Sequence, residues 1–183
     1  MRTEEFAKFV RSQQELVPKG GIDWSETREQ WLLALDSLYG QILEFLREYT
    51  STGSIKYGFS EIELSEQGIG RYTARRMEIT IGRQRVLLNP VGTLIIGGRG
   101  RVDAEGSAGR AQILLVDERA HSASDLIKVT VTVGNKGTVP PPPATPRESI
   151  KWRWKIVTTS VPRKFVDLDK ESFFALLMEI ANG

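Results

Sequence analysis

The strongest constraint on the fold is a change in the spacing of apolar residues near residue 54. Before that point, six large apolar side chains recur at intervals of three and four residues: Trp31, Leu35, Leu38, Ile42, Phe45 and Tyr49. This spacing places them on one stripe of a helix over residues 24–50. Asp23, three residues before Glu26, predicts the start of the helix, because a carboxylate there accepts bonds from free N–H groups. The large aromatic side chains favour packing across a sheet over a coiled-coil seam.

After residue 54 the apolar residues alternate with polar ones, which is the period of a β-strand. Turn residues such as Asn89-Pro90 and Gly97-Gly98 separate these runs. The pattern predicts eight strands, at residues 54–57, 60–65, 71–81, 84–89, 93–104, 110–117, 126–133 and 149–158. Because no helical pattern intervenes, short connections and an antiparallel meander are expected.

Three further segments complete the predicted organisation. Asp169 predicts the N-cap of a C-terminal helix whose apolar face includes Phe173 and Leu177. Residues 138–147 are rich in proline, which lacks the N–H donor of a sheet ladder, so an exposed loop is expected there. The prediction is one α+β domain over residues 22–183. Its many-stranded, curved antiparallel sheet is packed by the long helix and the C-terminal helix.

Residues 1–21 are expected to form a helical arm. Its candidate contact residues are Phe6, Phe9 and Val10, which lie near one face of the predicted helix. A helix this short is marginal alone in water. We therefore expect the arm to dock on its own domain or on a neighbouring subunit, with disorder as the third alternative.

Residue types exclude several kinds of chemistry. The chain has no cysteine and one histidine, which excludes disulfides, thiolate nucleophiles and zinc–thiolate sites. His121 is close to Ser122 and Asp125, but neighbours in one loop rarely converge as a catalytic triad, so a surface loop is expected. Asp103 and Glu105, two residues apart on a strand, are weak candidates for an acidic metal site, since side-by-side carboxylates bind hard cations. No cofactor is expected.

Two further motifs favour structural interpretations. The glycine-rich residues 97–101 lack the helix that follows a phosphate-binding loop, so a hairpin or a strand bent by glycine is expected. The longest apolar runs, such as residues 113–116, are far shorter than the roughly 20 residues that span a bilayer. We therefore expect a cytoplasmic protein that makes no membrane contact.

The charges are separated along the chain. The total is 25 basic and 23 acidic residues, but residues 1–70 hold 7 and 12, whereas residues 71–183 hold 18 and 11. Eight arginines fall on or between the predicted central strands: Arg71, Arg75, Arg76, Arg83, Arg85, Arg99, Arg101 and Arg110. Either they pair with acids of the long helix and neighbouring strands, or they form a basic surface for nucleic acid or an acidic protein. The alternating row Lys151, Arg153 and Lys155 is a second candidate basic surface.

These observations favour a non-catalytic binding or scaffolding protein that acts through protein–protein contacts. Self-association through the arm or a sheet edge is included in that expectation. The main alternative is a nucleic-acid-associated protein that uses the arginine-rich sheet face. The third is a hydrolytic enzyme with an acidic metal site at Asp103 and Glu105. The sequence does not decide whether the sheet encloses a small-molecule pocket, because close packing of the tryptophans would fill such a space.

Overall fold

The fold is described from a computed structural model. It covers residues 23–93, 95, 97–126 and 150–182. The predicted arm with Phe6, Phe9 and Val10 and the proline-rich loop 138–147 lie outside the described residues. So does all of the predicted strand 126–133 except its first residue.

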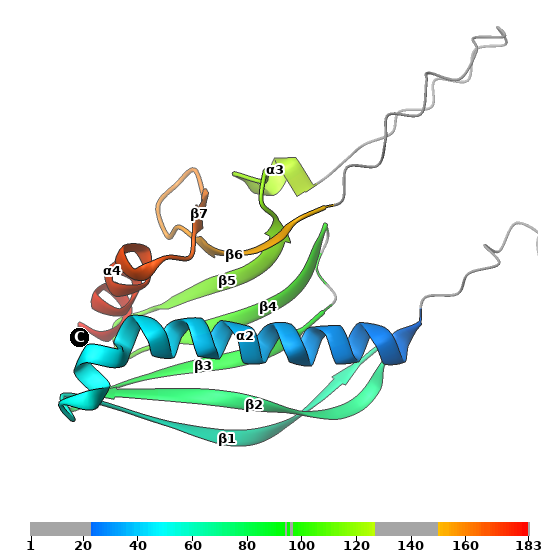
Figure 1. The fold of residues 1–183 in the computed structure, drawn as a ribbon. Helices are drawn as coiled ribbons and strands as arrows, with labels where there is room; N and C mark the ends of the chain where they lie inside the picture. Colours follow the sequence, from blue (N-terminus) through cyan, green and yellow to red (C-terminus); the bar gives the residue numbers. More distant parts are fainter. Residues whose placement is uncertain (1–22, 94, 96, 127–149, 183) are drawn as a thin grey trace, which may run out of the picture.

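The long helix, α2 (Trp24–Ser51), lies along one face of the sheet (Figure 1). The Asp23 carboxylate accepts hydrogen bonds from the backbone N–H groups of Ser25 and Glu26, both at 3.0 Å, as its capping position predicted. The stripe is buried at Trp31, Leu35, Leu38, Tyr39, Ile42 and Leu46. The helical period therefore identified the face that packs on the sheet.

In the part of the chain that the structure describes, seven antiparallel strands form an open sheet whose spatial order equals their order in the sequence. They are β1 (Ile55–Glu66), β2 (Gly70–Ile81), β3 (Gln84–Gly92), β4 (Gly98–Glu105), β5 (Arg110–Asp117), β6 (Trp152–Val157) and β7 (Phe165–Asp167). The predicted α+β class and antiparallel sheet are confirmed. Figure 1 shows the sheet twisting strongly, with α2 across it and α4 (Lys170–Ala181) beside one end of α2.

Several predicted boundaries are wrong. The separate strands 54–57 and 60–65 are one strand, because β1 stays paired with β2 without interruption through Gly58. The last predicted strand is shorter, and the three-residue β7 and the short helix α3 (Ala123–Leu126) were not predicted. Elements this short carry too few residues for a period to be visible.

The main core lies between α2, α4 and the inner face of the sheet. Asp169 caps α4 through a reciprocal capping box with Ser172, and Phe173 and Leu177 of α4 are buried. A smaller apolar cluster lies on the opposite side of the sheet at β5 and β6, and consists of Leu114, Val116, Ala120, Val157 and Phe165. This second cluster explains why β5 is buried at consecutive positions rather than alternate ones.

Candidate functional site

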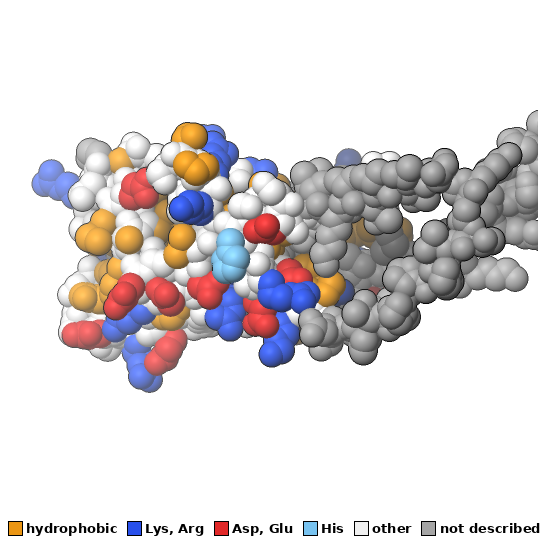
Figure 2. Space-filling model, turned by 90° about the horizontal axis from the view of Figure 1, so that it is seen from above, with side chains coloured by type: hydrophobic (Ala, Val, Ile, Leu, Met, Phe, Trp, Pro, Cys, Tyr) orange, Lys and Arg blue, Asp and Glu red, His pale blue; other side chains and the backbone are white. Residues whose placement is uncertain are grey.

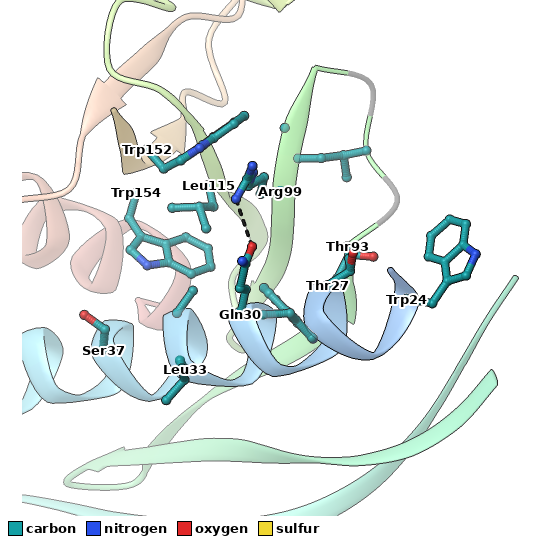
Figure 3. A pocket seen from close by; sticks show the side chains of 14 residues that line it. Trp24, Thr27, Gln30, Leu33, Ser37, Thr93, Arg99, Leu115, Trp152 and Trp154 are labelled. Atoms are coloured by element: carbon teal, nitrogen blue, oxygen red, sulfur yellow. Dashed lines mark hydrogen bonds between the residues drawn. The ribbon is translucent and has the colours of Figure 1, made fainter. Parts of the chain in front are cut away.

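All four tryptophans of the chain line one open pocket of about 780 Å³ (Figure 3). The pocket lies between the first half of α2 and residues of β4, β5 and β6. Leu33, Ile95 and Leu115 add apolar surface, and Leu33 is 69% exposed at α2. Two segments far apart in the sequence, α2 and β6, therefore supply the aromatic walls.

Trp31 and Trp154 form the buried part of these walls. Their ring centroids are 6.2 Å apart at an angle of 49°, and Trp31 is only 2% exposed. The Trp31 ring lies directly against the backbone of Gly100, where an added Cβ would come within 2.2 Å of the ring. The register between β4 and β5 also shifts between Gly98 and Gly100. The glycine-rich segment is thus a bent strand, one of the two expected structures, and the missing side chain of Gly100 makes room for Trp31.

Trp24 lies at the start of α2 and packs on the turn between β1 and β2. The turn residue Gly68 has a φ of +89°, and a Cβ there would lie 2.6 Å from the Trp24 ring. Glycine is suited to both demands, because it adopts positive φ and leaves room for the indole. This contact fixes the beginning of α2 against the sheet.

Arg99 is the cation of the pocket. Its guanidinium carbon lies 4.6 Å from the centroid of the Trp152 ring, and its Nη1 donates a 3.0 Å hydrogen bond to Gln30 Oε1 (Figure 3). Gln30 in turn donates from Nε2 to Glu26 Oε1 at 2.8 Å. Within the described ranges, Arg99 makes no ion pair with a carboxylate. The pocket therefore combines aromatic walls with a positive charge that forms no ion pair with a described carboxylate.

A carboxylate behind the pocket holds the β3–β4 connection. Glu66 accepts hydrogen bonds from the Tyr72 hydroxyl and from both the backbone N–H and the hydroxyl of Thr93, the last two at 2.8 and 2.9 Å. Burial and the bond to Glu66 raise the pKa of Tyr72, so its hydroxyl stays protonated as a donor. Thr93 lines the pocket. These bonds fix that wall of the pocket.

Five of the eight predicted arginines pair with carboxylates. The pairs are Arg71–Glu63 at 3.9 Å, Arg75–Asp36 at 2.5 Å, Arg85–Glu78 at 2.7 Å, Arg101–Asp103 at 2.7 Å and Arg110–Glu105 at 3.4 Å. Asp36 belongs to the long helix, and the other acids lie on the arginines' own or neighbouring strands. Internal pairing, one of the two interpretations of the charge pattern, therefore accounts for most of this set.

The other three arginines differ from one another. Arg76 donates to the Ser60 hydroxyl at 3.2 Å, and Arg99 lies in the pocket. Arg83 lies in the β2–β3 turn, where it makes no hydrogen bond or ion pair with another described residue. Of these three, Arg99 is the one that lies in the pocket without an ion pair to a described carboxylate.

The row Lys151, Arg153 and Lys155 is not an evenly solvated basic face. Lys155 is 1% exposed, and its Nζ donates to the backbone carbonyls of Glu118 and Ala120, both at 2.7 Å. The same ammonium lies 3.2 Å from Asp167 Oδ1. Arg153 also pairs with Asp167, at 3.3 Å. The second apolar cluster buries Lys155. The alternation of apolar and basic residues in the sequence did not reveal this burial.

The two weak candidates for an acidic metal site, Asp103 and Glu105, are both paired with arginines. Both oxygens of Asp103 accept from Arg101, at 2.7 and 2.8 Å, and Glu105 pairs with Arg110. The hydrogen bond to Asp103 raises the pKa of Arg101. No group of three or more histidine or acidic side chains suited to a metal occurs among the described residues.

His121 is exposed. The Asp125 carboxylate accepts from the backbone N–H groups of His121 and Ser122, at 2.8 and 2.9 Å. These bonds hold the pKa of Asp125 below its usual range. Figure 2 shows the histidine at the surface, on a face where acidic and basic side chains are interspersed.

Comparisons with protein-family models, curated proteins and solved structures gave no match. Among the helices in the described ranges, none has the length and apolar character needed to cross a membrane. The geometry of the pocket is thus the main guide to function. The sequence pattern placed Trp31 on the long helix and Arg99 on a central strand, but no local pattern indicated that they line one pocket.

Proposed function

We propose that this protein is a non-catalytic binding protein that holds an apolar ligand carrying an anionic group. The observation that supports this proposal most directly is Arg99, an uncompensated cation in an open pocket lined by tryptophans. Binding sites commonly combine apolar and aromatic walls with a few placed polar groups that fix orientation. An apolar body would cover Leu33 and the indoles, and the anion would face the guanidinium.

The chemistry of Arg99 favours a carboxylate or a similar flat anion. A guanidinium presents parallel N–H donors that match such an anion in bidentate geometry, while its face stays stacked on an indole. The stacking on Trp152 and the bond to Gln30 hold the side chain in place, so little of its freedom remains to be lost on binding. An aromatic or aliphatic acid and an acidic–apolar protein segment share this chemistry.

A pair of fluorescent probes tests the proposal. Anilinonaphthalene sulfonate carries an aromatic body and an anion, whereas N-phenyl-1-naphthylamine has the aromatic body without the charge. Both probes should bind and should quench the fluorescence of the pocket tryptophans. Arg99→Gln should weaken binding of the sulfonate probe by about three- to tenfold, since a charged hydrogen bond at an exposed side chain contributes about 1 kcal/mol. The same substitution should leave the affinity for the neutral probe unchanged.

Arg83→Gln is the matched control, because it removes the same charge from a turn outside the pocket. It should change neither affinity. Equal weakening by the two substitutions would mean that the overall charge, rather than the pocket, attracts the anion. Loss of both probes in Arg99→Gln would also contradict the assigned role.

The earlier alternatives stay predictions. Nucleic-acid binding would have to use arginines of which most are paired, and it requires an affinity that falls steeply with salt. Scaffolding through protein contacts is compatible with the pocket if the ligand is a segment of a partner.

A further inference from the structure

The two edges of the sheet differ greatly in length. At one edge β7 has three residues, whereas at the other β1 has twelve. Within the described residues, β1 pairs only with β2, so its outer edge has no strand partner. Shortness protects an edge from pairing with other chains, as do proline, central lysines and bulges. β1 is long, contains no proline and pairs with β2 without a register shift.

Two aromatic side chains are exposed on this edge strand. Tyr57 is 48% exposed and Phe59 is 38% exposed, and their ring centroids are 6.0 Å apart. Phe59 is held from inside, because its ring lies 5.5 Å from the Tyr39 ring and 4.9 Å from the Arg75 guanidinium carbon. Tyr57 and Phe59 face Ile79 and Met77 of β2, so both point to the same side of the sheet. The edge thus presents an ordered aromatic pair beside unpaired backbone.

The charges of β1 select the orientation of a strand that is added to it. Lys56 lies near the start, while Glu61 and Glu63 lie in the second half, and all three are exposed. A second β1 in parallel would place like charges side by side. An antiparallel copy centred on Gly58 would instead place Lys56 opposite Ser60 and Glu61 opposite Ile55, so no like charges lie opposite each other. The antiparallel orientation therefore avoids the like-charge contacts of the parallel one.

We propose that two copies of this chain associate through an antiparallel β1–β1 pair with its two-fold axis near Gly58. In this register Tyr57 of each copy lies opposite Phe59 of the other, and both share one face. Lys56 lies opposite Ser60 of the second copy, and Glu61 lies opposite Ile55. Such an interface is the same patch on both subunits, so it closes as a dimer and leaves the short β7 edges outermost. This inference is independent of the pocket.

Gly58 provides a substitution that tests the dimer without damaging the fold. A Cβ at Gly58 would meet no atom within 4 Å, and its backbone does not need positive φ. Gly58→Lys places two ammonium groups together at the two-fold axis. Gly58→Thr is the matched control, because it adds a side chain of high strand propensity and no charge. Both variants should keep the wild-type melting temperature within a few degrees.

The measurement is the molar mass by light scattering across a concentration series of the full chain. Wild type and Gly58→Thr should approach twice the 20.5 kDa chain mass. Gly58→Lys should raise the dissociation constant at least about tenfold, because like charges placed opposite each other repel.

Three outcomes would overturn the inference. They are a wild-type chain that stays monomeric up to about 1 mM, a Gly58→Lys variant that dimerises as tightly as wild type, and a dimer lost only when residues 1–21 are deleted. The last result would assign association to the arm.

Discussion

Replacing Lys155 should show most clearly how much more stability this fold loses with a buried charge than with an exposed one. Its ammonium is 1% exposed and has three acceptors, the carbonyls of Glu118 and Ala120 at 2.7 Å and Asp167 Oδ1 at 3.2 Å. Lys155→Met keeps the length and apolar stem of the side chain but removes all three donors. The two carbonyls then lose a partner in a place that water reaches poorly.

The expected loss of unfolding free energy is about 3 kcal/mol. Each orphaned buried carbonyl costs about 1–3 kcal/mol, and relief of the desolvated ammonium offsets part of the sum. The Asp167 side chain is 47% exposed, so water and Arg153 compensate it. For a chain of this size, 3 kcal/mol corresponds to a fall in melting temperature of roughly 6–12 °C.

Lys151→Met is the matched control. Lys151 lies four residues earlier, its side chain is 74% exposed, and its ion pair with Glu118 is 3.9 Å long. Its replacement should cost less than about 0.5 kcal/mol. Urea denaturation of both variants measures the difference, and hydrogen exchange should show faster exchange of amides in residues 118–126 for Lys155→Met alone. Equal free energies for the two variants would refute the assigned role of the buried ammonium.

Two further predictions test local features. Gly100→Ala should lower the unfolding free energy, measured in urea, by about 1–3 kcal/mol, because its Cβ would lie 2.2 Å from the buried Trp31 ring. Gly58→Ala is the control, and equal losses of stability in the two variants would contradict the prediction. The hydrogen bond from the backbone N–H of His121 is the main cause that lowers the pKa of the Asp125 carboxylate. The ionised carboxylate therefore contributes stability above its unfolded pKa of about 3.9, and this stability is lost as the pH falls through the lower folded pKa. The amide shift of His121 should therefore titrate with a midpoint below about 3.9, and a midpoint at or above that value would contradict the assignment.

The fold was largely predictable because its signals are local. The Asp23 and Asp169 caps depend on side chains within three residues of each helix start. The stripe from Trp31 to Leu46 and the alternation in β2 and β4 reflect periods that any short window of sequence contains. What failed was the interruption expected at Gly58, since glycine does not distinguish a turn from a strand that simply lacks a side chain.

Local patterns were enough to predict the long helix and an antiparallel sheet, and the lack of cysteine excludes thiol chemistry. The order of the strands and the pairing of the charges became known only from the folded chain. Arg75 and Arg99 are alike in the sequence, yet Arg75 meets Asp36 whereas Arg99 meets Trp152 and a pocket. Lys151 and Lys155 are also alike, yet only Lys155 is buried. The physical reason is that period and capping act over a few residues, whereas burial and pairing depend on segments that only packing brings together.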